Sequence, residues 1–249
     1  AALYAILKTQ ADYTRYIPLT SDSLPRVATD YFGTPRRKNY RAAMAWYSLG
    51  CYYTEQHADG DAIEVYLKAK DFFPDTLSRY HALCYQNIGK HLYLHDMPQQ
   101  AIPYLEAFRG HPACASDSAL LSNADYCLGV AYLRDFDFRK AEEAFFAVLN
   151  NRHASEKDSK NVTFQLSKLL YHEHDNDGAS LGLIDKFIRD SLSSGQIGAL
   201  WTLKGNIYYH YSEMDSAMCY YKRALQATDD IYARCEIFKH LLNLAPLMN

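Results

Sequence analysis

The sequence lacks the patterns that would place it in a membrane or mark a familiar catalytic site. No stretch of its 249 residues approaches the length of about 18 consecutive apolar residues that a membrane-spanning helix needs, and no secretory signal peptide is recognisable. The chain has no P-loop, no G-x-G-x-x-G, no H-E-x-x-H and no G-x-S-x-G motif. We therefore expect neither catalytic residues nor a cofactor, and no enzymatic function.

A basic excess is also missing. The formal net charge is −3, whereas surfaces that bind nucleic acid normally carry an excess of Lys and Arg. We therefore expect no nucleic-acid partner. The six cysteines form no C-x2-C pair, which leaves a zinc knuckle or a thioredoxin-like motif unsupported. Five of them fall within expected helices, where we expect free thiols in or near the core.

Histidines suggest two polar groups but no metal site. His91 and His95 are four residues apart on an expected helix, and His172 and His174 lie beside two aspartates near an expected turn. A protein metal site usually needs three or four converging ligands, and neither group supplies them locally. We therefore expect no bound metal.

Aromatic residues, in contrast, are abundant, with 22 tyrosines in the chain. The most informative stretch combines large, glycine, aromatic and small residues at fixed offsets: Trp46, Leu49, Gly50, Tyr53, Ala62, Tyr66, Ala69 and Pro74. This pattern resembles the tetratricopeptide repeat (TPR), in which two short antiparallel helices form one unit. The resemblance implies an all-α, right-handed TPR-type α-solenoid of antiparallel helix pairs.

The spacing of the repeat glycine gives the period. Gly50 and Gly89 are 39 residues apart, Gly89 and Gly129 are 40 apart, and Gly129 and Gly205 are 76 apart, which is twice 38. The doubled step indicates a repeat that has lost its glycine. Lys168 occupies the glycine place and Ser180 the place of the facing alanine, so we expect a looser helix crossing in that repeat. Because one pair cannot bury its apolar face alone, neighbouring pairs must stack into a continuous core.

The whole chain is therefore expected to be one superhelical domain. Its expected parts are an N-terminal capping helix pair at 1–34, five repeats at 35–74, 75–114, 115–153, 154–192 and 193–229, and a terminal helix at 230–249. We expect Asp59-Gly60-Asp61 to form the turn of the first repeat. Pro103 lies inside an expected helix, which we expect to start late or to bend there.

A narrower resemblance covers roughly the first 75 residues. Ser21-Asp22-Ser23-Leu24, Asp30-Tyr31-Phe32 and the run from Tyr47 to Tyr52 are similar to the TPR region of bacterial membrane-tethered regulator or sensor proteins. That resemblance implies an export signal and a membrane helix outside this chain, and it favours an extracytoplasmic location over a cytoplasmic one. The chain begins at Ala1 without methionine, and we expect it to be a processed form or a fragment.

TPR arrays usually bind through the concave surface that the first helix of each repeat lines. The residues expected on that surface, and not needed for the core, are Tyr47, Cys51, Thr54, Gln86, Lys90, Tyr93, Asn123, Tyr126, Gln165, His172, Asn206 and Tyr209. Tyrosine combines a flat apolar face with a hydroxyl group, which suits peptide recognition. The alternative interpretation is that these tyrosines pack against adjacent repeats.

We therefore predict a non-catalytic scaffold that binds a protein or peptide of unidentified sequence, as the sensing or assembly region of a bacterial tethered regulator. A cytoplasmic TPR adaptor is the first alternative. The second alternative is a self-association module, because the terminal helix places Ile231, Cys235, Phe238 and Leu242 on one face and has no expected partner helix.

Overall fold

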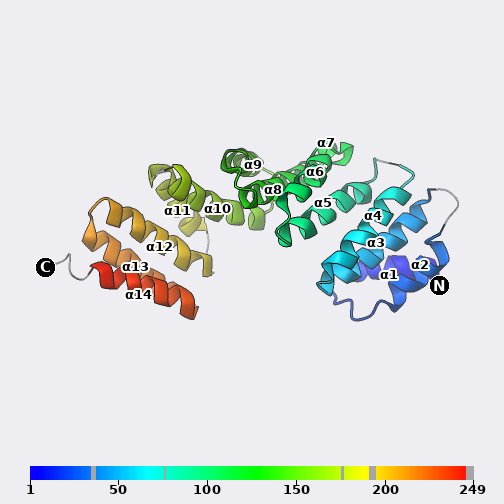
Figure 1. Ribbon diagram of the computed structural model, residues 1–249, viewed down its shortest axis with the longest axis horizontal. Coiled ribbons are helices and arrows are strands. Elements are labelled where there is room, and N and C mark those ends of the chain that lie inside the picture. The colour runs from blue at the N-terminus through cyan, green and yellow to red at the C-terminus, as the bar shows by residue number, and fades with distance from the viewer. Residues whose placement is uncertain (35–37, 76, 175–176, 191–194, 245–249) are drawn as a thin grey trace. The chain divides into compact units, whose positions relative to one another are not determined.

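The computed structural model describes the chain except for residues 35–37, 76, 175–176, 191–194 and 245–249. Within the described residues every regular element is a helix, and consecutive helices pair with one another (Figure 1). The chain divides into two compact units, residues 1–154 and residues 155–249, which we call the N-terminal and C-terminal units. None of the described helices is long and apolar enough to cross a membrane.

The N-terminal unit contains four helix pairs and one short extra helix. In chain order they are α1 (Ala2–Thr14) with α2 (Ser23–Phe32), α3 (Tyr40–Glu55) with α4 (Asp59–Phe72), α5 (Arg79–Leu94) with α6 (Pro98–Arg109), then α7 (Pro112–Ser116), and α8 (Ser118–Arg134) with α9 (Phe138–Asn150). Helix α6 runs on through Pro103, so it does not start late there. The short α7 was not expected from the sequence.

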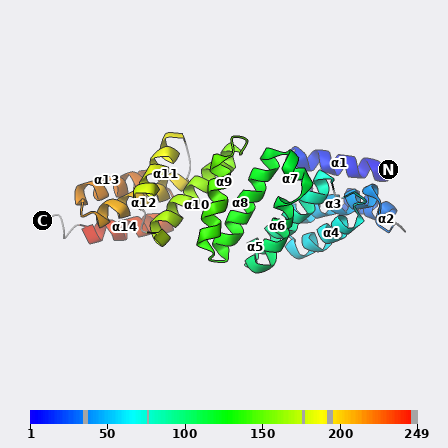
Figure 2. The same ribbon diagram turned by 90° about the horizontal axis from the view of Figure 1, so that it is seen from above.

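The C-terminal unit contains two helix pairs and a last helix (Figure 2). These are α10 (Glu156–His174) with α11 (Asp177–Asp190), α12 (Gly195–His210) with α13 (Met214–Ala227), and α14 (Ile231–Leu244). Helix α14 packs on α13 through Ile237 and Leu244, which are buried with Tyr221 in one cluster. All six cysteines are free thiols; four are buried, and Cys219 and Cys235 are exposed.

The repeat glycines mark the points where the two helices of a pair come closest. A Cβ atom on Gly50 would lie 2.5 Å from Cε1 of Tyr66, and one on Gly205 would lie 2.5 Å from Cε1 of Tyr221. Both tyrosines are fully or almost fully buried, so neither ring has room to retreat. Only glycine permits these crossings, which is why its spacing reports the repeat period.

The repeat without a glycine joins its helices in another way. The Ser180 hydroxyl group donates a hydrogen bond of 2.9 Å to the carbonyl oxygen of Ser167, and both serines are fully buried. Lys168 does not insert between the helices. Its side chain is exposed, and its ammonium group lies 5.3 Å from the centre of the Phe164 ring. Ser180 thus replaces an alanine contact with a hydrogen bond to the backbone.

In four repeats whose turns the structure describes, the turn between the paired helices is built on a residue with left-handed backbone geometry. His57, Asp96, Phe136 and Ser212 have φ angles of 55°, 56°, 60° and 60°, at the same place in four repeats. The expectation that Asp59-Gly60-Asp61 forms the first turn is therefore wrong, because these residues begin helix α4. Acidic side chains are favoured in a first helical turn, where they face the positive end of the helix dipole.

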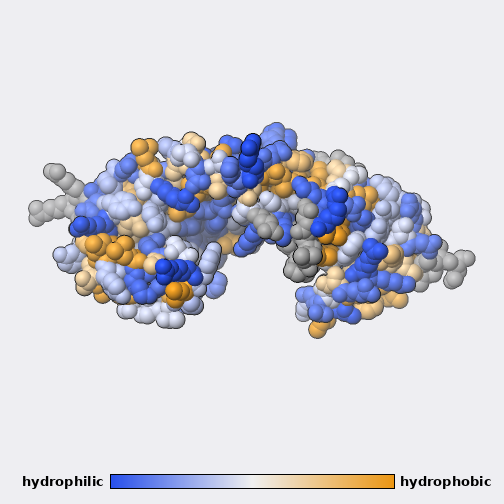
Figure 3. Space-filling view, turned by 180° about the vertical axis from the view of Figure 1, so that it is seen from behind, coloured by the Kyte–Doolittle hydropathy of each residue, from blue (hydrophilic) through white to orange (hydrophobic). Residues whose placement is uncertain are grey.

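The first helix pair leaves apolar side chains uncovered. Leu3, Tyr4 and Leu7 are each about half exposed or more on α1, and Tyr31 is largely exposed on α2. Figure 3 shows hydrophobic side chains gathered over this pair. Terminal repeats of a repeat protein usually present a polar outer face, so this surface is less polar than a capping pair requires.

Candidate functional site

Four of the residues expected on the inner surface are buried: Tyr47, Cys51, Gln86 and Tyr93. Tyr47 packs edge-on against Tyr66 and Tyr80, at 5.5 Å and 5.2 Å between ring centres. The amide nitrogen of Gln10 in α1 approaches the Cys51 sulfur to 3.7 Å. Neighbouring helices therefore cover these side chains, which offer no surface to a partner. Tyr47 and Tyr93 thus pack against adjacent repeats, as the alternative interpretation of the sequence expected.

The other expected residues of the N-terminal unit, Thr54, Lys90, Asn123 and Tyr126, are partly exposed. The Gln86 amide group donates a hydrogen bond to the Asn123 side-chain oxygen, which joins α5 to α8. Lys90, Asn123 and Tyr126 thus lie on the first helices α5 and α8, beside this polar bridge. They remain candidates for contact with a partner.

In the C-terminal unit the first helices form a groove. Its volume is about 280 Å³, and α10, α12 and α14 line it. Of the expected residues, Asn206 lines this groove, Gln165 is partly exposed on α10, and Tyr209 is 37% exposed on α12. The side chain of His172 lies outside the described residues.

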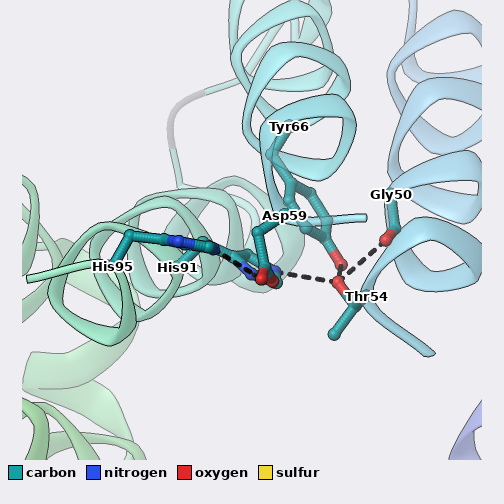
Figure 4. Close-up of polar contacts among 6 residues, drawn as sticks. All are labelled: Gly50, Thr54, Asp59, Tyr66, His91 and His95. Carbon is teal, nitrogen blue, oxygen red and sulfur yellow. Dashed lines mark hydrogen bonds and ion pairs between the residues drawn. The ribbon is translucent and has the colours of Figure 1, made fainter. Parts of the chain in front are cut away.

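A buried polar network joins the first two repeats (Figure 4). His91 of α5 is only 5% exposed, and its two ring nitrogens meet partners from two other helices. Nδ1 lies 2.5 Å from Oδ1 of Asp59, the first residue of α4, and Nε2 lies 3.0 Å from Oγ1 of Thr54 in α3. The exposed His95 reaches the second Asp59 oxygen at 2.6 Å. The two histidines therefore share one carboxylate.

The Thr54 hydroxyl group is central to this network and has one hydrogen to donate. When His91 is neutral and donates from Nδ1 to the Asp59 carboxylate, its Nε2 is an acceptor 3.0 Å from Thr54 Oγ1, and the Gly50 carbonyl oxygen is a second acceptor at 2.9 Å. The Tyr66 hydroxyl oxygen lies 3.1 Å from the same Thr54 oxygen. The chain of hydrogen bonds thus runs from the buried Tyr66 to the surface at His95. Among the described residues, no group of three or more His, Cys, Asp or Glu side chains is placed to hold a metal ion.

The order Thr54–His91–Asp59 is that of a nucleophile, a base and an acid in a catalytic triad. Its surroundings, however, indicate that it holds helices together. The Thr54 hydroxyl group also lies 2.9 Å from the Gly50 carbonyl oxygen of its own helix, and His91 is almost completely covered. A catalytic base must reach its substrate within hydrogen-bonding distance. The network therefore works as a clamp between helices α3, α4 and α5.

We expect this clamp to weaken on acidification. Burial, opposed by Asp59, lowers the pKa of His91 below its ordinary value of 6.5, so the unfolded chain takes up a proton that the folded unit resists. This contribution to stability is complete above pH 6.5 and is lost as the pH falls toward the folded pKa of His91. Burial alone would raise the pKa of Asp59, but hydrogen bonds from His95 and His91 hold it below 3.8, so its contribution is lost only at still lower pH.

Urea unfolding between pH 7.5 and 5 measures this effect. In the wild type the free energy of unfolding should fall with pH, with a share from His91 of at most about 1.4 kcal/mol per pH unit. His91→Gln should be less stable at pH 7.5 and should show a flatter dependence near pH 6. His95→Gln, at the exposed end of the network, is the control and should lose less stability at pH 7.5 than His91→Gln does. Equal slopes for wild type and His91→Gln would contradict the assignment.

Comparisons with known proteins bear on the fold. No protein-family model and no curated protein matches the sequence. Among solved structures, that of pilF from Pseudomonas aeruginosa superposes with a TM-score of 0.71 and 17% identity, covering 96% of this chain and 97% of that one. MamA from Desulfovibrio magneticus RS-1 gives 0.58 and 18%, covering 76% and 93%. A tetratricopeptide repeat protein from Parabacteroides merdae gives 0.50 and 15%, covering 100% and 99%.

The chain has the TPR fold. Twelve of the fourteen helices in its described residues form six pairs in sequence order, and the all-α TPR-type prediction is confirmed. The superpositions establish the architecture, but identities of 15–18% carry no information about binding. The partner of this TPR chain therefore has to be argued from its own side chains.

Sequence reasoning missed several groove residues of the C-terminal unit of this TPR chain. Lys168, Ala199, Thr202 and Glu236 line the groove but were not expected there. From the sequence, Lys168 is expected only as a break at the glycine place, and the terminal helix only as a surface for self-association. The positions of these residues on the first helices of successive pairs could have identified them as candidates for the groove.

Proposed function

We propose that this TPR chain is a non-catalytic scaffold that binds a protein or peptide. The observation that carries the proposal is the groove along α10, α12 and α14 in the C-terminal unit. Small side chains, Ala199, Thr202 and Ala233, keep it open, and the partly buried Phe164 supplies apolar surface. Apolar walls with a few fixed polar groups are typical of ligand sites.

Polar groups of the groove suit an extended polypeptide. The Tyr221 hydroxyl group donates to the Asn206 side-chain oxygen at 2.8 Å, which fixes the amide and leaves its NH2 group to donate to a peptide carbonyl. Lys168 on α10 and Glu236 on α14 place one charge of each sign on the groove lining. A bound peptide with opposite charges at matching places would gain orientation from them.

The finer proposal is that the chain is the extracytoplasmic sensing or assembly region of a bacterial tethered regulator. It rests on the resemblance of the first 75 residues. A cytoplasmic adaptor of the same fold is the alternative. The complete gene distinguishes them, because a tethered regulator encodes an export signal and a membrane helix beside this region. A gene that encodes neither would overturn the tethered proposal.

We expect Ala199→Trp to block the groove without unfolding the chain, because Ala199 is exposed on α12. Peptides selected from a displayed random library on the wild type should bind Ala199→Trp at least about tenfold more weakly, a loss of about 1.4 kcal/mol. Ala179→Trp, at an exposed position on the second helix α11, is the matched control and should bind as the wild type does. Selected peptides that bind both variants equally would place the binding surface elsewhere.

Self-association is a second candidate, favoured by α14. Ile231 and Leu242 are 73% and 71% exposed, Phe238 is 48% exposed, and Cys235 lies between them on the same face. Such a stripe would be covered if two copies paired through it. Light scattering decides: a dimer that Leu242→Glu converts to a monomer supports this candidate, and a monomer at all concentrations excludes it.

A further inference from the structure

The third repeat departs from the internal pattern of the chain at two positions. Four residues before the repeat glycine, or the lysine that replaces it, stand Trp46, Tyr85, Asp125, Phe164 and Trp201. Fifteen residues after it stand Val65, Tyr104, Ala144, Leu183 and Tyr220. The third repeat alone lacks an aromatic ring at the first place, and it has the smallest side chain at the second.

Where both positions hold rings, they fill the space between helices. Tyr85 and Tyr104 lie 6.5 Å apart between ring centres, and the Lys70 ammonium group lies 5.7 Å from the centre of the Tyr85 ring. Trp201 and Tyr220 stack at 5.5 Å with an angle of 13° between planes, and a cation lies near both rings. Each pair of rings is thus accompanied by a basic side chain, a favourable cation–π arrangement.

The third repeat has a cavity of about 420 Å³ at this place, lined by α6, α8 and α9. Helix α8 lies between α6 and α9 in the N-terminal unit and packs against both (Figure 2). Asp125 and Ala144 both line it, with Leu128 and Ala147 adding apolar surface. A carboxylate and a methyl group stand at the sequence positions that Tyr85 and Tyr104 hold one repeat earlier, and both groups line the open cavity.

Basic side chains lie at this cavity, as they lie beside the ring pairs of the second and fifth repeats. Arg109, which corresponds to Lys70 in the preceding repeat, donates from Nε to Asp125 at 2.5 Å while its side chain stays 52% exposed. Lys140 lies 5.1 Å from the centre of the Tyr132 ring, and the Tyr132 hydroxyl group donates to Glu106 at 2.8 Å. The lining therefore offers two cations for the face of a ring, and carboxylate oxygens for an N–H or O–H donor on its edge.

We infer that this cavity binds a tryptophan or tyrosine side chain presented by a partner polypeptide. The ring takes the place that the chain fills with its own Tyr85 and Tyr104 in the preceding repeat, and its N–H or O–H group donates to Asp125 or Glu106. This second site lies in the N-terminal unit and does not depend on the groove of the C-terminal unit. It adds to the scaffold a recognition element for one aromatic residue.

The test uses N-acetyl-tryptophanamide and N-acetyl-tyrosinamide as probes, with N-acetyl-leucinamide as the apolar control, followed by NMR on the isotope-labelled chain. We expect saturable shifts confined to α6, α8 and α9 for the aromatic probes, with a Kd on the order of 1 mM or lower for so small a ligand. The leucine analogue should bind at least tenfold more weakly. Equal binding of all three probes, or no saturable shift for the aromatic ones, would overturn the inference.

Two alanines at equivalent places supply a matched pair of variants. Ala147→Trp should fill the cavity from within and weaken the aromatic probes at least tenfold. Ala107→Trp, forty residues earlier at the same place of the preceding repeat, should leave their binding unchanged. Asp125→Tyr, which restores the residue of the preceding repeat, is a second filling variant if Ala147→Trp does not fold. Wild-type affinity in a folded filling variant would contradict the site.

Discussion

Replacing Gly205 with leucine is expected to destabilise the C-terminal unit by about 3 kcal/mol or more, because overpacking at a closed helix crossing forces side chains and backbone apart. Even the first added carbon would lie 2.5 Å from the Tyr221 ring. That ring is 1% exposed, bonded to Asn206 through its hydroxyl group, and stacked on His240 at 5.1 Å. Moving it would break all of these contacts.

Gly182→Leu is the size-matched control in the same unit. Gly182 is also helical, within α11, but nothing lies within 4 Å of a Cβ atom added there. Leucine has the better helix propensity by roughly 0.8 kcal/mol, so this variant should be slightly stabilised. Urea unfolding followed by circular dichroism compares the two. Similar stabilities for both variants would mean that Gly205 is not confined by Tyr221.

Replacing Arg109 with alanine is expected to destabilise the N-terminal unit by about 3 kcal/mol. Asp125 is only 6% exposed in its side chain and would lose the cation that pairs with it at 2.5 Å, and breaking a buried ion pair from one side typically costs about 3–5 kcal/mol. The lower end of that range applies because the guanidinium group is half exposed. The same hydrogen bond from Arg109 to Asp125, followed by their charge attraction, raises the pKa of Arg109.

Arg139→Ala is the control for a lost arginine. Its partner Glu143 lies 2.6 Å away, but both side chains are mostly exposed, so the loss should be about 0–1 kcal/mol. The double variant Arg109→Lys, Asp125→Tyr reproduces the Lys70 and Tyr85 pair of the preceding repeat and should recover most of the lost stability. An Arg109→Ala variant as stable as Arg139→Ala would show that Asp125 is not held by this pair.

Helices of this chain could be predicted well because their signals are local. The repeat glycines from which the helix pairs were predicted, Gly50, Gly89, Gly129 and Gly205, lie within helices α3, α5, α8 and α12. The turns were harder, because their left-handed positions hold His57, Asp96, Phe136 and Ser212 in place of glycine. Phe136 and Ser212 give no turn signal at φ > 0, a region that non-glycine residues rarely adopt, and the enrichment of His and Asp there is too weak to identify a turn. The position becomes visible only when the repeats are placed side by side.

The exposure of the expected binding residues could not be predicted from the sequence, because periodicity gives the face of a helix and not what covers it. Tyr47 and Cys51 are on the expected face, yet α1 and α5 close over them. His91 and His95 were weighed only as metal ligands, since the sequence does not show that Asp59, more than thirty residues earlier, meets both. Asp125 stands out only in a comparison of the repeats, because the other four have an aromatic residue at the equivalent position.

The sequence by itself determined the repeat, its period and the close helix crossings, because glycine spacing follows directly from the steric demand of two touching helices. It also determined where the pattern is broken, at Lys168 and at Asp125. Only the tertiary structure decided what those breaks produce. Lys168 lies on the lining of the groove in the C-terminal unit, and Asp125 with Ala144 opens a charged cavity in the N-terminal unit. The physical reason is that an open volume depends on neighbouring helices as well as on the residue that changed.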